Sequence, residues 1–306
     1  MTLAASDSLD HATTVLERAD WQQQRADHAD RADRLTATYR AHRARGERHA
    51  IDDFLFTYYS YRPSVLRKWH PGVGTRLSDA QEYATARWYV ADASGHVTVD
   101  ARAFLEERSD LVRNITALNR AVLGRPAQFG CFGLHEWAMV YREDEHRHPI
   151  PLRLGQRGTD EVVETHRIQC SHFDAFRFFT PEARPLNTLQ PTRAQQCALD
   201  QGGCLHANMD LYKWAIKLGP LVPGDLLLDT FELAREIRWL DMRASPYDVS
   251  DYGVDAVKIE TAEGKAQYVR EQRAFAERAA DIRARLLEVI TTAERIASGD
   301  DPRASN

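Results

Sequence analysis

Apolar residues recur with a helical period along most of this chain, and the longest such run lies near the C-terminus. Between Thr261 and about Ala297, apolar side chains return every seven residues, with a second apolar series between them. The two series are Tyr268, Phe275, Ile282 and Val289, and Ala279, Leu286 and Ala293. This spacing predicts one long helix whose apolar stripe packs on the body of the protein or on a second copy of the chain.

Helical composition also marks much of the remaining sequence. We predict further helices over residues 13–45, 79–90, 100–123, 129–142, 205–218 and 225–239. For residues 90–100 the sequence predicts a turn with a strand or hairpin. In 150–173 the apolar residues alternate instead, so that Ile168, Cys170 and His172 would share one face of a strand. The predicted fold class is therefore mainly α: a single helical domain with a small β element around 150–173 and a long C-terminal helix.

Length and composition fit one large domain. The chain has 306 residues, and its 43% of apolar residues is ample for a sizeable core. No linker or 20–50-residue repeat divides it. We expect a flexible N-terminal tail over 1–10, one globular domain over 11–297 and a flexible C-terminal tail over 298–306.

Charge and cysteine content narrow the function classes. Asp and Glu number 45 against 40 Lys and Arg, so the formal net charge is −5 and does not support DNA binding, which usually uses a basic excess. A local basic face remains compatible with DNA as a partner. Four cysteines make no disulfide framework. Without a signal-peptide pattern or a run of roughly 18–20 apolar residues, we expect a cytoplasmic protein that has no membrane partner.

Three short runs combine ionisable side chains with large aromatic ones: residues 129–141, 166–179 and 203–218. An ionisable group beside Phe or Trp lies in a low-dielectric setting, where its pKa is readily shifted. These runs are therefore the best candidates for a functional site.

The last run places His206 and Asp210 one helical turn apart, with Lys213, Trp214 and Lys217 along nearly the same side. Asp210 could hold His206 in one tautomer and make it a general base, with Trp214 as a wall of the site. A buried salt-bridge cluster at a helix end is an equally good interpretation.

The middle run places Asp174 and Arg177 three residues apart among phenylalanines. A charge in such surroundings needs a partner, and a structural Asp174–Arg177 pair provides one. In the functional interpretation, Asp174 stabilises a cation that develops on a substrate, while Phe176 stacks on a flat ring.

Histidine and cysteine positions raise the question of zinc. Cys170, His172, Cys204 and His206 offer two sulfurs and two imidazoles for a tetrahedral site. The first run contains His135, Glu136 and Trp137 but has Met139 where a His-Glu-x-x-His protease has its second histidine. No cofactor is our first expectation, with zinc on the two Cys-x-His pairs as the alternative.

Six runs of this sequence together resemble an actinobacterial protein family commonly labelled 3-methyladenine DNA glycosylase. The resemblance covers nearly the whole chain, and the runs are FLFTYYSYRP, WHPG, FGCFGLHEWAMVYR, SHFDAFRFFTP, CLHANMDLYKWAIKL and DMRASPYD. It implies a hydrolase of base-excision repair that cleaves the N-glycosidic bond of an alkylated purine.

That chemistry needs aromatic surfaces for a flipped base and a carboxylate near the sugar. For catalysis the candidates are Asp174, Asp210, His172 and His206. For substrate binding they are Trp137, Phe176, Arg177, Lys213, Trp214 and His135.

Two other functions stay open. The same residues could form an enzyme for a small, flat or anionic metabolite, with or without a metal, in which Lys213, Arg177 and Arg167 hold the anion. Alternatively the chain is a binding protein whose long terminal helix contacts a partner, such as a second copy of itself.

Overall fold

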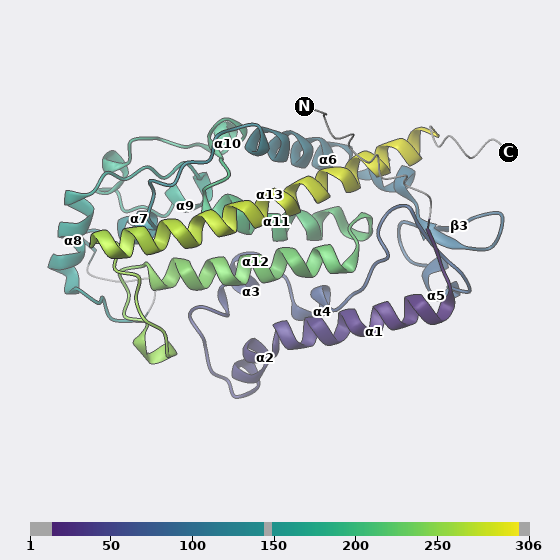
Figure 1. Ribbon diagram of the computed structural model, residues 1–306, viewed down its shortest axis with the longest axis horizontal. Coiled ribbons are helices and arrows are strands. Elements are labelled where there is room, and N and C mark those ends of the chain that lie inside the picture. Colours follow the sequence, from purple (N-terminus) through teal and green to yellow (C-terminus); the bar gives the residue numbers. More distant parts are fainter. Residues whose placement is uncertain (1–13, 144–148, 300–306) are drawn as a thin grey trace, which may run out of the picture.

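The computed structural model describes residues 14–143 and 149–299. Four long helices make up the body of the molecule, and α13 runs along it in front of α11 and above α12 (Figure 1). They are α6 (Ala101–Leu123), α11 (Leu205–Leu218), α12 (Gly224–Arg243) and α13 (Ala262–Ser298). The prediction of a mainly helical fold with a long C-terminal helix is confirmed.

Local sequence explains where α13 begins and ends. The hydroxyl of Thr261 accepts a hydrogen bond from the Gly264 amide, and Gly299 closes the helix with a φ of 78°. The apolar stripe is buried or half-buried against α6, α11 and α12, so it packs on the body of the same chain.

Two buried polar residues of α13 also hold the start of α11. Gln272 donates to the carbonyl of Gly203 (2.6 Å), and Arg283 donates to the carbonyl of Ala207 and the amide oxygen of Asn208 (3.1 Å each). Arg283 also reaches Asn119 on α6. These hydrogen bonds hold the start of α11 in position against α13.

The remaining helices lie before or between these four in the chain. The predicted helix over 13–45 is divided at Thr36, whose hydroxyl bonds to the carbonyl of Ala32. The predicted helices over 79–90 and 129–142 are much shorter than expected, because residues with positive φ interrupt them. The remaining helices are α1 (Arg18–Leu35), α2 (Ala37–Ala44), α3 (Phe54–Tyr58), α4 (Pro63–Leu66), α5 (Gln81–Ala84), α7 (Leu134–Ala138), α8 (Gly155–Thr165), α9 (Phe173–Phe176) and α10 (Gln196–Leu199).

A small mixed sheet lies at the end of the molecule where Figure 1 labels β3. Its order is β1-β2-β4-β3, with β1 parallel to β2 and the other pairs antiparallel. The strands are β1 (Thr14–Leu16), β2 (Thr75–Leu77), β3 (Tyr89–Ala91) and β4 (Val97–Val99). The hairpin expected within 90–100 is confirmed as the β3–β4 pair.

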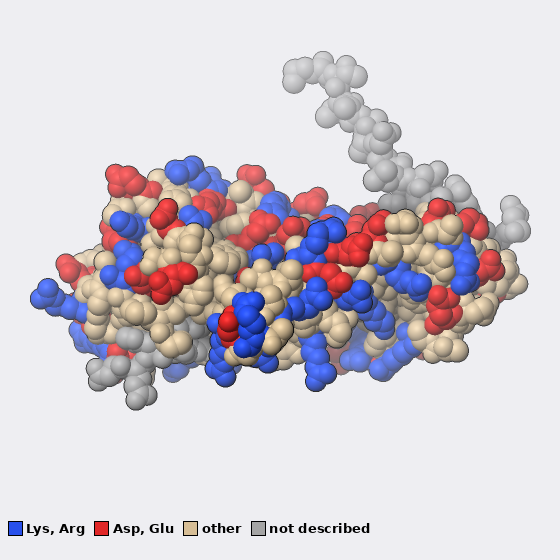
Figure 2. Space-filling view, turned by 90° about the horizontal axis from the view of Figure 1, so that it is seen from below, with Lys and Arg blue, Asp and Glu red and all other residues tan. Residues whose placement is uncertain are grey.

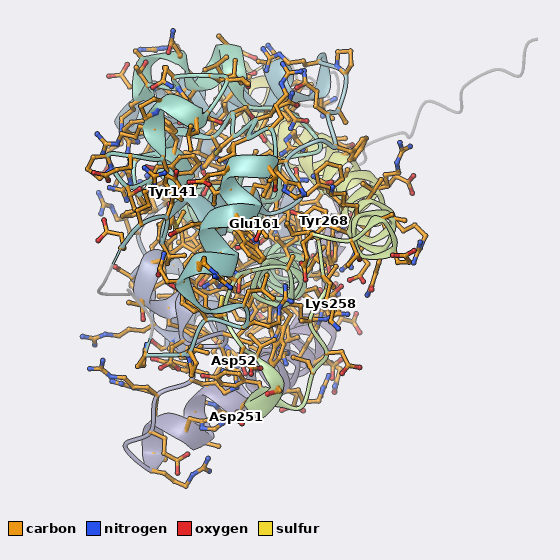
Figure 3. The ribbon with its side chains drawn as sticks, turned by 90° about the vertical axis from the view of Figure 1, so that its left-hand side faces the viewer. Asp52, Tyr141, Glu161, Asp251, Lys258 and Tyr268 are labelled. Atoms are coloured by element: carbon orange, nitrogen blue, oxygen red, sulfur yellow. The ribbon has the colours of Figure 1, made fainter. Side chains whose placement is uncertain are left out.

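The β element expected around 150–173 is wrong in its position. The middle of that region forms α8, whose buried side chains Thr159, Val162 and Val163 follow a helical spacing. Only single bridges remain of the alternating segments on either side, Leu152 with Tyr247 and Ile168 with Asn187. Seen from the end of the molecule where α8 lies, Glu161 of α8 appears between Tyr141 and Tyr268 (Figure 3).

The predicted tails over 1–10 and 298–306 lie outside the described residues, apart from Ser298 and Gly299 at the end of α13. Among the helices that the structure describes, none combines the length and apolar character required to cross a bilayer.

A tight turn at Gly203 sets the direction in which α11 begins. The Gln201 side chain bonds to the amides of Gln128 and Gly203 (2.7 Å each) and to the Gln128 carbonyl (3.2 Å). A Cβ atom at Gly203 would lie 2.2 Å from the Gln128 carbonyl oxygen, whereas at the adjacent Gly202 it would meet only Ala127, at 3.7 Å.

We therefore expect Gly203→Ala to lower the free energy of unfolding by about 1–3 kcal/mol, since backbone has to move to admit the methyl group. Gly202→Ala is the matched control and should change it by less than about 1 kcal/mol. Urea unfolding of both variants measures the difference. Equal stabilities would show that this close approach does not constrain the turn.

Candidate functional site

The three aromatic-rich runs meet in the interior, where α7, α9, α11 and α12 bring together three histidine rings. The ring of His206 lies at 4.6 Å from that of His135 and at 5.7 Å from that of His172, measured between centroids. All three side chains are buried. The fold therefore brings the three runs together, and their histidines form a row with His206 in the centre.

The predicted pair of His206 and Asp210 does not form. Although the two residues are one turn apart on α11, Asp210 accepts hydrogen bonds from Tyr59 (3.0 Å) and Lys213. Among the described residues, neither ring nitrogen of His206 has a hydrogen-bond partner. Burial, followed by the neighbouring charge of His135, lowers the pKa of His206 well below its ordinary value.

One end of the row is the His135 group, which we define as His135, His206 and Asp241. Nε2 of His135 donates to Oδ1 of Asp241 at 2.9 Å. Burial lowers the pKa of His135, but the charge and hydrogen bond of Asp241 outweigh burial and raise it well above its usual range. Burial raises the pKa of Asp241, and His135 reverses that shift and lowers it.

A buried ion-pair network adjoins this group. Arg238 is 1% exposed and donates through Nη1 to Glu136 (2.7 Å) and to Oδ2 of Asp241 (3.0 Å). Glu136 therefore has its ion-pair partner on α12. Burial raises the pKa of Glu136 despite the opposing effect of Arg238.

The other end of the row is the His172 group, which we define as His172, Asp174 and Asp210. Nδ1 of His172 donates to Asp200 (2.9 Å), while its buried Nε2 has no hydrogen-bond partner and lies 4.0 Å from Oδ2 of Asp210. Burial lowers the pKa of His172, but Asp200 outweighs burial and the pKa is raised. Asp200 thus holds the ring so that Nε2 faces Asp210.

The His172 group extends from the interior to the surface. Side-chain exposure rises from 3% at Asp210 through 10% at Asp174 and 16% at Lys213 to 44% at Arg177 and 65% at Arg193. Asp174 accepts a hydrogen bond from Arg193 (2.9 Å) and forms an ion pair with Arg177 at 3.3 Å. The predicted Asp174–Arg177 pair is therefore confirmed, with Arg193 as a second cation.

Lysines continue this cationic surface. Nζ of Lys213 lies 4.3 Å and that of Lys217 lies 5.4 Å from the ring centre of Trp214. Burial, followed by the charge of Lys213, lowers the pKa of Lys217. We call Arg177, Arg193, Lys213 and Lys217 the cationic rim. Asp174 and Asp210 offset two of these four positive charges, and the remaining excess favours a bound anion.

Other predicted residues lie elsewhere. Trp137 is fully buried and donates to the Ala244 carbonyl (2.8 Å), and Phe176 is buried against Phe179. Arg167 is exposed. His135 lies behind His206 as seen from the cationic rim, since His206 separates it from His172. Trp137 and His135 thus belong to the interior.

The alternative zinc ligands are not brought together as a set. In residues 14–143 and 149–299, the groups of at least three metal-ligating side chains with ligand atoms within 4.8 Å of one another are the His135 group and the His172 group. Neither contains Cys170 or Cys204. Burial raises the pKa of both thiols, which disfavours the thiolate that zinc binds.

Sequence reasoning missed Tyr59, Asp200 and Asp241. Tyr59 lies in an aromatic run that was not linked to any acid, yet its hydroxyl donates to Asp210. Asp241 lies near the end of α12 directly after the apolar pair Trp239 and Leu240, and a carboxylate with 0% exposure needs a partner. That mismatch between charge and surroundings was the available signal.

Comparison of the chain with protein-family models, with curated proteins and with solved structures finds no match in any of the three. The geometry of the His135 group and the His172 group and the resemblance described above are therefore the grounds for a function.

Proposed function

We propose that the His172 group is the catalytic centre of an enzyme that hydrolyses the N-glycosidic bond of an alkylated purine, with 3-methyladenine in DNA as the substrate that the family resemblance implies. The observation that carries the proposal is the pairing of Asp174 with Asp210. An oxygen of each lies within 4.8 Å of the other and of a nitrogen of His172, at the point where the interior meets the cationic rim.

The chemistry fits these side chains. A base alkylated at N3 carries positive charge and leaves readily, so the enzyme has to stabilise the cationic sugar that develops. The Asp210 carboxylate, which is almost fully buried, is suited to that role. The attacking water forms its bond to the anomeric carbon as the bond to the base breaks, and its proton passes to Nε2 of His172.

The surroundings supply binding. The half-buried ring of Trp214 offers a surface on which a flat base can stack. The cationic rim provides contacts for phosphate groups. Asp174, between the rim and Asp210, would hold Arg177 and Arg193 in position for those contacts.

A second candidate is an enzyme for a small, flat, anionic metabolite that uses the same residues without DNA. The charge distribution favours it. Figure 2 shows the face on the α1 side of the molecule, where basic and acidic side chains are interspersed and form no continuous basic band. The cationic rim alone provides enough positive charge for one or two phosphate or carboxylate groups.

Release of free base from methylated duplex DNA tests the first proposal. We expect the full chain to release 3-methyladenine, detected by mass spectrometry, and to bind the duplex more weakly as salt increases. Absence of both, together with a raised melting temperature in nucleotides or other flat anions, would reject the glycosylase and support the metabolite enzyme.

A further inference from the structure

We propose that the His135 group binds one divalent transition-metal ion, with His135, His206 and Asp241 as its protein ligands. This site is separate from the catalytic centre proposed above. It shares only His206 with the cysteine-containing set considered from the sequence, and it includes no residue of the cationic rim.

The ligand atoms already have a suitable spacing. One atom from each of the three side chains lies within 4.8 Å of the other two. Nε2 of His135 and Oδ1 of Asp241 are 2.9 Å apart. Two ligands that each lie about 2.1 Å from a metal ion at roughly right angles are about 3 Å apart. A cation that displaces the proton between these two atoms would therefore need little movement of either side chain.

His206 supplies the independent observation. The residue is 7% exposed and makes no hydrogen bond within residues 14–143 and 149–299, although its ring nitrogens are not fully closed to water. A neutral imidazole without a protein partner keeps a nitrogen lone pair available for a ligand bond. A metal ion coordinated by the nitrogen that faces His135 and Asp241 would use that lone pair.

The residues around the three ligands are arranged as outer partners of a metal site. Arg238 bonds to Oδ2 of Asp241 and leaves Oδ1 for the ion. Nδ1 of His135 lies 3.7 Å from the sulfur of Cys131. Partners of this kind orient ligands and are a usual part of metal sites.

Charge balance points the same way. Glu136 and Asp241 are 5% and 0% exposed and share the single cation Arg238. Two buried carboxylates exceed one guanidinium by one negative charge, which is costly in the interior unless a further cation offsets it. Without metal, the proton held between His135 and Asp241 supplies that positive charge, and a divalent ion that displaces this proton takes over its role.

The His172 group is a poorer metal site for a specific reason. The oxygen of Asp210 nearest to His172 is Oδ2, and this is the atom that Lys213 bonds. Oδ1 of Asp174 is shared by Arg177 and Arg193. Lysine and arginine side chains therefore already contact the carboxylate oxygens that a metal ion would need as ligands.

Two imidazoles and one carboxylate define the class of ion. This ligand set suits Zn²⁺, Fe²⁺ or Co²⁺, whereas Mg²⁺ and Ca²⁺ prefer oxygen ligands. Three protein ligands leave coordination positions for water or for an atom of a bound molecule.

Metal titration of the full chain tests this site without any activity assay. After chelator treatment and dialysis, we expect one equivalent of Zn²⁺ or Co²⁺ to bind, measured by calorimetry and elemental analysis, with a visible Co²⁺ absorption band. His206→Ala should weaken binding at least about 100-fold, because even the loss of an outer partner costs a metal site up to about that factor. The His206 side chain makes no hydrogen bond in the described structure, so this variant should fold, which circular dichroism checks.

Asp174→Asn is the matched control, since it alters the other group and should bind metal as the unaltered chain does. The site is rejected if the unaltered chain binds neither ion stoichiometrically, if His206→Ala binds as tightly as the unaltered chain, or if Asp174→Asn alone loses the ion. Metal binding and base release are measured separately, so either proposal can fail while the other stands.

Discussion

Replacing Arg238 with Met should lower the free energy of unfolding by about 3–5 kcal/mol, the cost of removing one partner from a buried ion pair. Glu136 and Asp241 would then keep two buried carboxylates without their shared cation. The guanidinium also lies 4.0 Å from the ring centre of Phe54, a contact that Met can replace only in part. Urea unfolding in the presence of a chelator measures the loss without a contribution from bound metal.

Arg278→Met provides the control, because Arg278 pairs with Glu236 where both side chains are 44% exposed. Its effect should stay below about 1 kcal/mol. Should both variants prove equally stable, the Arg238 network would contribute no more than a surface pair, and the excess of buried negative charge argued above would be incorrect.

Asp210→Asn should reduce release of 3-methyladenine by about 100- to 1000-fold, the range for removing one electrostatic contact to a transition state. The amide is neutral and cannot offset the positive charge that develops on the sugar. Asparagine keeps the shape of the side chain and can still accept from Tyr59, while Lys213 is exposed enough to turn toward water. Single-turnover base release at saturating enzyme measures the chemical step.

Asp229→Asn is a suitable comparison, since Asp229 is ion-paired with Arg31 and Arg285 away from the row of histidines. It should release base at the unaltered rate. Asp174→Asn should also reduce base release. It should change DNA binding more than Asp210→Asn does, because Arg177 and Arg193 lose the carboxylate that holds them in position. Unchanged release from both Asp210→Asn and Asp174→Asn would refute the catalytic assignment.

The long helices could be predicted from sequence because their signals are local. α11 begins and ends where its composition predicted, and α12 and α13 differ by only a few residues from expectation. The sheet was harder, since each of its strands has only three residues and the pairing of β1 with β2 joins segments about 60 residues apart. In 150–173 the alternation of apolar residues at both ends is visible in the sequence. The residues between these ends have a helical period, however, and they form α8.

The location of the site could be predicted from the sequence, but the hydrogen-bond partners of its residues could not. Local reasoning put His206 with Asp210, whereas the structure gives Asp210 to Tyr59, 151 residues away in sequence, and brings Asp241 to His135, 106 residues away. Partners so distant along the chain depend on how α7, α11 and α12 pack. No spacing rule within one helix contains that information.

The contacts of α13 with the start of α11 also bear on synthesis of the protein. The ribosome synthesises α6 and α11 well before Gln272 and Arg283. Until then the carbonyls of Gly203 and Ala207 lack the side chains that donate hydrogen bonds to them in the folded protein. We expect the nascent central helices to stay loosely associated until α13 emerges from the exit tunnel. The histidine row would then assemble only in the last stage of translation or after it.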